Sequence, residues 1–490
     1  MIETQDRRAL VAVDLGAESC RVSLLRWHGD EPEIELIHRI QNGPVFDPAK
    51  GENGELRWPL DTILAGIEEG LRKAAAAAPE GIRSIAVDGW AVDYVRLDAD
   101  GRAVNAPYCY RDERTVAAKA AVDELISAEE LFARTGAQPL RINTVYQLVA
   151  DAQAELDTKM SWMLLPEYVL YWLGGRRVAE YTNATHTGLV DIETGNWSRP
   201  VFERFGLAIE AAPPIVAAGT IVGRVRGELA SLPAFADTAL IAPACHDTAS
   251  AIAAIVEDIE HTAYIVSGTW SLVGTVVEKP VTSAEAMRAG FTNQGAAARG
   301  YCFHANVNGM WLVKQCLDHW CGAGRAIELA ALVAQAAEVA SIPGTVDVDA
   351  PSLLLTGAMP ARINEELRRT GCNAIEDVPG NEPIFAKVIF SSLAMRYAQV
   401  LRNLESLTGR SFQRITILGG GSRNALLRRL TEESTGLPVA LGEAEGSTLG
   451  NFAVQLASET ETGADQGRKP AEDFQRRVRA WAARLVGDSR

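Results

Sequence analysis

The sequence predicts an α/β protein of two similarly built domains, each a mixed sheet flanked by helices, around a central cleft. The chain has 490 residues, which exceeds the size of one ordinary hydrophobic core. Short apolar segments alternate with longer segments of helical periodicity. Residues 10–27 and 261–277 share one pattern, an apolar strand, a small turn and a second apolar strand. This repeat suggests that each stretch opens one copy of a duplicated domain.

The first half begins with three apolar segments, residues 10–15, 21–27 and 33–40, which predict an antiparallel meander of strands. Helical spacing over residues 60–78, with a run of alanines, predicts a helix. The apolar segment at 84–90 predicts a further buried strand.

Residues 130–172 predict helices, interrupted near 136–141. We place the domain boundary after residue 255, which gives an N-terminal domain of residues 1–255 and a C-terminal domain of residues 256–490. The C-terminal domain ends with a strand, a triple-glycine turn, a helix, a strand and a helix of small residues. The Arg-rich last twenty residues predict a solvated amphipathic helix.

Composition and charge exclude several classes of protein. The hydrophobic share of 47% is typical of a globular protein, and the absence of any run of about 18 apolar residues predicts no transmembrane helix and no membrane partner. The net charge of −16 argues against nucleic acid as a partner. Seven scattered cysteines and seven histidines without metal-binding spacing predict reduced thiols and no histidine metal cage. We expect a cytoplasmic protein.

The segment DLGAESCR ends the first strand in a carboxylate, Asp14, beside a glycine, Gly16. A strand-end carboxylate can hold Mg²⁺ through water, and a glycine lets a ligand approach the backbone closely. A tight turn of backbone N–H groups can bind an anion. The alternative is a hairpin turn in which Asp14 caps its own backbone.

Three further segments could line a ligand site. The segment SGTWS, residues 267–271, could form half of a phosphate clamp or an ordinary β-turn. The glycines at 419–421 favour ligand binding over a turn that only needs positive φ, because a phosphate can lie against bare backbone at a helix N-terminus. Asp247, in CHDT, could accept a proton from a substrate hydroxyl or could cap a helix.

A candidate sugar site is spread over the segments DGWAVDY and RDERT. Aromatic rings pack on sugar faces, and carboxylates and guanidinium groups bind hydroxyls. Each side chain could instead be a core aromatic or part of a surface ion pair. The candidates are Asp88, Trp90, Asp93, Arg111, Asp112 and Arg114.

In this order, the segments resemble the FGGY carbohydrate kinases, and within that family the rhamnulokinases. The matching segments span nearly the whole chain and include VAVDLGAESCRVSLLRW, EYTNATHTGLVDIETGNW, CHDTASAIAA, AYIVSGTWSLVG and LGGGSRNALL. The resemblance implies two ribonuclease-H-like domains of the actin-like ATPase fold around a cleft. It implies ATP and Mg²⁺ as cofactors and phosphorylation of a ketose sugar such as L-rhamnulose at its terminal hydroxyl. A homodimer is also implied, because homodimers are common in this family.

The resemblance also implies the roles of individual residues. Asp247 matches the catalytic base, and Asp14 matches the metal-binding position. The positions implied to bind the nucleotide are Asp14, Gly16, Ala17, Glu18, Ser19, Cys20, Arg21, Gly268, Thr269, Lys314, Gly420 and Gly421. The positions implied to bind the sugar are Trp90, Ala91, Asp93, Arg111, His246, Thr248 and Asn306.

This sequence departs from the family pattern at both ends of the expected cleft. The departures are Glu18 for Ser, Cys20 for Gly, Gly89 for Thr, Ala91 for Gly, Gln294 for Glu, Ala296 for Gly and Lys314 for Gln. The added carboxylate of Glu18 should weaken ATP binding unless Mg²⁺ or Arg21 compensates. Such changes suggest an altered substrate preference, or less often lost catalysis.

Three hypotheses follow. The first is a kinase for L-rhamnulose or a related ketose such as L-fuculose, L-xylulose or L-ribulose. The second is a catalytically weak sugar-binding relative, which predicts sugar binding with little affinity for ATP. The third, an actin-like ATPase or assembly protein, lacks support because the segments on the sugar side match as well as those on the ATP side.

Overall fold

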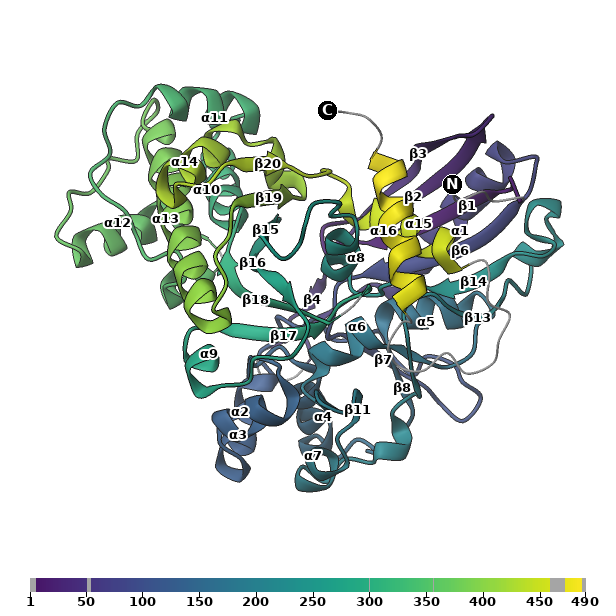
Figure 1. The fold of residues 1–490 in the computed structure, drawn as a ribbon. Helices are drawn as coiled ribbons and strands as arrows, with labels where there is room; N and C mark the ends of the chain where they lie inside the picture. Colours follow the sequence, from purple (N-terminus) through teal and green to yellow (C-terminus); the bar gives the residue numbers. More distant parts are fainter. Residues whose placement is uncertain (1–5, 51–53, 299, 356, 459–471, 487–490) are drawn as a thin grey trace.

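The computed structural model describes residues 6–50, 54–298, 300–355, 357–458 and 472–486. These residues form two six-stranded sheets, one in each half of the chain, with helices packed against them (Figure 1). The first sheet has the strand order β13 (Thr220–Arg224), β14 (Ala239–Ala242), β6 (Ile82–Gly89), β1 (Ala9–Leu15), β2 (Ser19–His28) and β3 (Glu31–Gln41). The predicted meander is therefore confirmed as β1, β2 and β3.

The second sheet repeats the plan of the first. Its order is β17 (Phe291–Gly295), β18 (Tyr301–Asn308), β16 (Trp270–Val277), β15 (Thr262–Ser267), β19 (Arg414–Leu418) and β20 (Val439–Leu441). Strands β1 and β15 correspond, because each pairs antiparallel with the next strand and parallel with a later one, β6 or β19. The two similar stretches of sequence thus open two copies of one fold, and the predicted fold class is confirmed.

The two central strands of the first sheet, β1 and β6, determine where its buried carboxylates lie. Every residue of β1 and of β6 is buried, as expected for parallel strands that are covered on both faces. The two strands run parallel, with Asp14 paired in register to Asp88. Their carboxyl ends therefore bring two carboxylates to one edge of the sheet.

Helices of the first half cover that sheet and form a layer beside it. In α1 (Leu60–Ala77) the buried residues Ile63, Ile67, Leu71 and Ala74 follow the helical period. The region predicted as helical also contains a short strand, β8 (Trp162–Leu164), which pairs with β7 (Tyr94–Arg96). The other helices are α2 (Thr115–Leu125), α3 (Ala128–Thr135), α4 (Thr144–Gln153), α5 (Leu165–Trp172), α6 (Tyr181–Ala184), α7 (Arg199–Arg204) and α8 (Asp247–Ala253).

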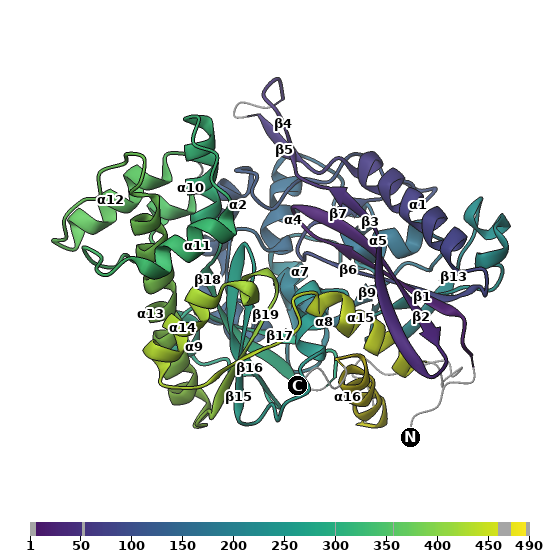
Figure 2. The same ribbon diagram turned by 90° about the horizontal axis from the view of Figure 1, so that it is seen from above.

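Short paired strands complete the first half. Figure 2 shows one of these pairs, β4 and β5, at the outer edge of the molecule. The pairs are β4 (Val45–Asp47) with β5 (Glu55–Arg57), β9 (Ala179–Glu180) with β12 (Ile215–Val216), and β10 (Val190–Asp191) with β11 (Asn196–Trp197).

Helix α13 (Glu382–Thr408) is the core helix of the second half. It is the one helix among the described residues that is long and apolar enough to cross a membrane, yet 67% of its apolar window is buried inside the protein. The burial identifies it as a packed core element. The neighbouring helices are α9 (Ala284–Arg288), α10 (Trp311–Gly322), α11 (Leu329–Glu338), α12 (Met359–Arg369) and α14 (Ala425–Thr435).

The last two helices, α15 (Gly446–Ala457) and α16 (Glu472–Val486), return to the first half of the chain. Helix α15 packs on β1, β6 and α8, and α16 packs on α15, as the yellow helices beside the purple strands in Figure 1 show. The division at residue 255 stays a prediction.

The expectation of a solvated terminal helix is wrong, because α16 buries Phe474, Val478 and Trp481, and the Trp481 ring meets Trp27 edge-on at 6.0 Å.

Candidate active site

Three carboxylates form the chemical centre of the candidate site. Asp14 and Asp88 end the paired strands β1 and β6, and Asp247 is the first residue of α8. A bridge between Gly89 and His246 joins the start of α8 to the end of β6. Asp14 and Asp88 are buried, whereas 33% of the Asp247 side chain is exposed. Asp247 is therefore the one of the three carboxylates that a substrate can reach.

Burial and mutual repulsion perturb these carboxylates. Burial, and then the negative charge of Asp14, raise the pKa of Asp88 well above its ordinary value. The same two causes raise the pKa of Asp247 to about 7, against hydrogen bonds from Thr248 that lower it. A carboxyl group with a pKa near neutrality suits general base catalysis.

The donor set fits a magnesium ion. Asp88 Oδ1 is buried and has no hydrogen-bond partner among the residues that the structure describes. Those residues also contain no group of three or more His, Cys, Asp or Glu side chains that could hold a metal by themselves. Mg²⁺ is commonly held by one or two carboxylates together with water and phosphate oxygens, so Asp14 and Asp88 are suitable protein ligands.

Helix α15 supports the carboxylates with polar side chains spaced four residues apart. Ser447 Oγ donates to Asp14 Oδ2 at 2.7 Å, and Asn451 Nδ2 donates to Asp88 Oδ2 at 2.5 Å. Gln455 Nε2 donates to the backbone oxygen of Val11 at 3.0 Å. The sequence reasoning assigned these three residues no role. The feature of the sequence that could have indicated them is their i, i+4, i+8 spacing, which places three polar side chains on one face of a helix made mostly of small and apolar residues.

The turn at residues 16–21 is compact. A Cβ on Gly16 would lie 2.4 Å from the backbone oxygen of Ser19, so the turn requires glycine there. Arg21 Nη1 donates to Asp14 Oδ2 at 2.9 Å, and Arg21 Nε lies 3.4 Å from Glu445. Arg21 is thus paired with Asp14. It is not paired with Glu18, so it does not compensate the negative charge of Glu18. Ala17 and Ser19 are half-buried in the same turn.

Cys20 is a packed thiol. Its side chain is fully buried and its Sγ lies 3.8 Å from the backbone oxygen of Gly16. Burial, reinforced by the negative charge of Asp14, raises the pKa of the thiol to about 12. A protonated, buried thiol is unreactive and fills space behind the turn.

The turn between β15 and β16 faces the first turn directly. Thr269 Oγ1 donates to Glu18 Oε1 at 3.2 Å, which joins the two halves of the molecule. The backbone oxygen of Gly268 accepts from Met310 N at 3.0 Å, which ties this turn to the start of α10. On α10, the exposed Lys314 pairs with Asp318 at 2.8 Å. The two turns predicted to bind phosphates are therefore neighbours.

The triple-glycine turn follows β19 and packs on β15. A Cβ on Gly421 would lie 2.0 Å from Ser267 Oγ, whereas a Cβ on Gly420 would meet nothing within 4 Å. Gly419 has φ +79°, which favours glycine. Gly421 is thus required for close packing, and Gly420 leaves open backbone.

The residues predicted to hold the sugar form a buried aromatic cluster and a half-buried rim. Asp93 is fully buried and accepts from Trp58 Nε1 at 2.6 Å, Trp90 Nε1 at 3.0 Å, Tyr110 N at 3.2 Å and Gln147 Nε2 at 3.0 Å. Because both of its oxygens are engaged, Asp93 orients the indoles of Trp58 and Trp90, whose rings lie 4.3 Å apart. It does not present an oxygen to a ligand.

Arg111 bridges the two halves of the molecule. Its guanidinium group lies 4.6 Å from the ring centre of Trp311, the first residue of α10. Ala91 is buried, and Asn306 is half-buried on β18. The other two candidates, Asp112 and Arg114, are engaged by the protein, since Asp112 accepts from Leu56 N and Arg114 pairs with Asp151 at 2.6 Å. Those two are structural groups.

His246 and Thr248 flank Asp247. Thr248 Oγ1 donates to Asp247 Oδ1 at 3.2 Å, and His246 Nε2 lies 3.4 Å from the same oxygen. The helix-cap alternative for Asp247 is not what the structure has, because the N-cap residue of α8 is His246.

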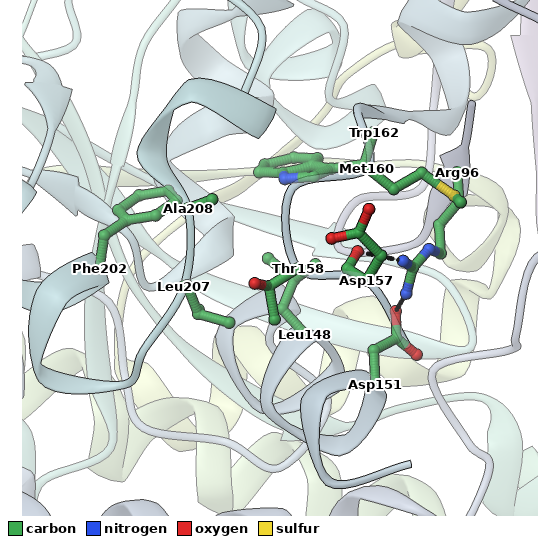
Figure 3. A pocket seen from close by; sticks show the side chains of 10 residues that line it. All are labelled: Arg96, Leu148, Asp151, Asp157, Thr158, Met160, Trp162, Phe202, Leu207 and Ala208. Atoms are coloured by element: carbon green, nitrogen blue, oxygen red, sulfur yellow. Dashed lines mark hydrogen bonds and ion pairs between the residues drawn. The ribbon is translucent and has the colours of Figure 1, made fainter. Parts of the chain in front are cut away.

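A small cavity elsewhere shares no residue with this site. It lies beside α4 and α7. Arg96, which lines it, donates to Asp151 Oδ2 at 3.0 Å and to the backbone oxygen of Asp157, and Figure 3 marks both bonds. Its Arg96 and Asp151 are paired with each other, and none of the three site carboxylates lines it, so it does not compete as the functional site.

The family of the chain follows from comparison with known proteins. Residues 9–254 match the N-terminal domain of the FGGY family of carbohydrate kinases, and residues 263–459 match its C-terminal domain. The chain therefore belongs to the FGGY family of carbohydrate kinases, and it is a sugar kinase. The resemblance seen in the sequence is confirmed.

Individual known proteins resemble this chain over most of its length. The chain is 35% identical over 456 residues to the rhamnulokinase of Enterobacter sp. (strain 638), covering 92% of this chain and 89% of that protein. Its fold matches gluconate kinase from Lactobacillus acidophilus with a TM-score of 0.73 at 15% identity, over 97% and 96% of the two chains. It also matches Plasmodium falciparum glycerol kinase with ADP, with a TM-score of 0.70 at 14% identity, over 92% and 90%.

Proposed function

We propose that this kinase transfers the γ-phosphoryl group of ATP to the terminal hydroxyl of a ketose, converting L-rhamnulose to L-rhamnulose 1-phosphate. The observation that carries the proposal is Asp247, a partly exposed carboxyl group whose pKa is raised to about 7 by burial and by the neighbouring charge of Asp14. The 35% identity to a rhamnulokinase supports the choice of sugar.

In this proposal Asp247 accepts the proton of the sugar hydroxyl as its oxygen attacks the phosphorus atom. Alcohol phosphorylation needs such a base, an in-line arrangement and neutralisation of charge on the transferred group. The turn at residues 16–21, Thr269, Lys314 and the backbone at Gly420 hold the nucleotide. Asp14 and Asp88 would hold Mg²⁺, which supplies positive charge to the phosphates when bound.

The sugar lies against the first half of the chain. Trp90, which Asp93 fixes in orientation, provides an aromatic surface, and His246, Thr248 and Asn306 provide polar groups beside Asp247. Ala91 adds a methyl group to this side of the site, which favours a sugar that is less bulky at the facing position. An ATP-dependent reaction and reduced thiols suit the cytoplasm, and all seven cysteines are free.

A panel of ketoses with Mg-ATP and coupled detection of ADP tests the choice of sugar. We expect the highest kcat/KM with L-rhamnulose among L-rhamnulose, L-fuculose, L-xylulose and L-ribulose. A preference for another member of the panel would change the proposed sugar and leave the proposed phosphoryl transfer in place. Sugar binding without turnover, together with weak ATP binding, would support the catalytically weak relative instead.

A further inference from the structure

Two amide side chains of helix α15 form a buried ladder of hydrogen bonds that ends on one of the site carboxylates. Ser84 Oγ on β6 donates to Gln455 Oε1 at 2.7 Å. Gln455 Nε2 donates to Asn451 Oδ1 at 2.8 Å, and Asn451 Nδ2 donates to Asp88 Oδ2 at 2.5 Å. All four residues are at most 2% exposed. The nitrogen and oxygen atoms of both amides therefore have partners inside the protein, shielded from water.

A backbone carbonyl group fixes the direction of every bond in this ladder. Gln455 Nε2 also lies 3.0 Å from the backbone oxygen of Val11, which can only accept a hydrogen bond, so the amide nitrogen must face it. The second N–H of Gln455 then meets Asn451 Oδ1, which turns the Asn451 nitrogen toward Asp88. If the Asn451 amide were turned over, two donors would face each other at Gln455 and two acceptors at Asp88. Both contacts would be unfavourable in a buried site.

The ladder occupies one oxygen of Asp88 and leaves the other open. Asp88 Oδ1 is buried and has no hydrogen-bond partner in the described part of the chain. Asp14, its neighbour in register on β1, is also held at one oxygen, because Ser447 Oγ and Arg21 Nη1 both donate to Oδ2. A buried carboxylate oxygen without a partner is costly unless a cation or a donor reaches it. Asp88 Oδ1 is thus the atom available to a metal ion.

The packing of α15 sets the place of Asn451 independently of the ladder. A Cβ on Gly450 would lie 1.8 Å from the backbone oxygen of Ser250, so α15 packs directly against α8 at this point. Phe452 and Val454 of α15 belong to an apolar cluster that also contains residues of α16. Removal of the amide groups can therefore change the surroundings of Asp88 while α15 stays in place.

We infer that Asn451 and Gln455 are positioning residues for the metal site: they hold Asp88 by one oxygen and so direct the other, Oδ1, to the metal ion. This inference rests on the proposed function, in which Asp14 and Asp88 hold Mg²⁺. Carboxylates that bind metals depend on such outer hydrogen bonds, and their loss typically costs about 10- to 100-fold in metal affinity or activity. The two residues act only through Asp88, because the turns proposed to hold the nucleotide contain neither of them.

Binding of Mn²⁺ in place of Mg²⁺ tests this inference without turnover. Mn²⁺ is titrated into the enzyme with ADP, and the EPR signal of the free ion gives its dissociation constant. We expect Asn451→Leu, which removes the donor at similar size, to raise this constant about 10- to 100-fold. We expect Gln455→Met, which keeps the Asn451 donor and frees its orientation, to raise it about 2- to 10-fold, the value of one neutral hydrogen bond. The affinity for ADP without metal should not change in either variant.

A control variant separates positioning from a general loss of packing. Val454→Ala shortens a fully buried apolar side chain of the same helix. It should lower the melting temperature and leave the dissociation constant of Mn²⁺ as in the wild type. In assays of turnover, excess Mg²⁺ should restore most of kcat in Asn451→Leu, because weakened metal binding can be saturated whereas a distorted site cannot.

Three outcomes would overturn the inference. The first is an unchanged Mn²⁺ constant in folded Asn451→Leu. If that variant does not fold, an unchanged constant in Gln455→Met is the second. The third is an equal rise of the constant in Val454→Ala, which would mean that the packing of α15 and not the ladder matters.

Asp88→Asn separates failure of the inference from failure of the proposed function. If Asp88→Asn binds Mn²⁺ as tightly as the wild type does, the metal site of the proposed function is wrong. If Asp88→Asn loses Mn²⁺ and Asn451→Leu retains it, only the positioning role is wrong.

Discussion

Glu18 offers a direct test of how the two turns receive ATP. Its exposed carboxylate accepts from Thr269 Oγ1 at 3.2 Å, at the position predicted for a phosphate. Glu18→Gln removes the charge and keeps an oxygen that can accept from Thr269. The exposed Glu124 on α2, neutralised in the same way, is the matched control.

The size of the effect follows from the geometry. A phosphate bound by Thr269 lies about 4 to 6 Å from the Glu18 carboxylate, where two unit charges in water repel by about 1 kcal/mol. Removing that repulsion corresponds to about a fivefold change in affinity. Arg21 does not offset the charge, since it holds Asp14 and Glu445. We therefore expect Glu18→Gln to lower KM for ATP about fivefold, with kcat nearly unchanged.

Initial rates against ATP concentration at saturating sugar measure this effect. The difference between wild type and Glu18→Gln should shrink in 0.5 M salt, where the screening length falls to about 4 Å. An unchanged KM would mean that the phosphates bind away from Glu18. A higher KM for ATP, with a higher requirement for Mg²⁺, would mean that Glu18 helps to hold the metal, and the reasoning from repulsion would be refuted.

The remaining predictions concern pH, the triple-glycine turn and the terminal helix. Because Asp247 acts as an ionised base with a pKa of about 7, kcat/KM should fall as pH decreases below about 7, approaching tenfold per pH unit; a flat profile from pH 5.5 to 7.5 would contradict this. In Gly421→Ala the new Cβ would lie 2.0 Å from Ser267 Oγ, so the turn must shift and KM for ATP should rise strongly. Gly420→Ala should keep the melting temperature of the wild type, because a Cβ there meets nothing within 4 Å. Equal melting temperatures and equal KM values for the two variants would contradict the different roles assigned to these glycines. Trp481→Ala should cost about 3 to 5 kcal/mol in urea unfolding, because the ring is 1% exposed; a loss below 1 kcal/mol would argue against its packing role.

Local patterns predicted much of the fold. The apolar runs of the first strands, the period of 3.6 in α1 and the glycines at 419–421 are each readable within a short window of sequence. The carboxylate of Asp14 at the end of a buried strand was likewise visible. Its pairing with Asp88 depends on the parallel register of β1 and β6, which are joined by a long connection and have no local signal.

Long-range packing accounts for what the sequence did not reveal. Asp93 reads as a sugar-binding carboxylate beside tryptophans, but it is enclosed by donors from four separate segments. Helix α16 reads as a solvated helix because its arginines dominate the pattern. Its apolar face instead packs on α15 and on Trp27, and Trp27 lies over 400 residues earlier in the chain. Gln294 donates to His186, which in turn contacts His246, and these contacts similarly form only because β17 lies against the segment around His186.

The most direct test of the central claim is the rate of ADP formation with Mg-ATP and L-rhamnulose in wild type and in Asp247→Asn, with binding of both substrates measured in parallel. The account predicts turnover by the wild type. It predicts a fall in kcat of about 10²- to 10⁴-fold in the variant, with substrate binding retained. Turnover by the variant within threefold of the wild type would contradict the assignment of Asp247 as the base.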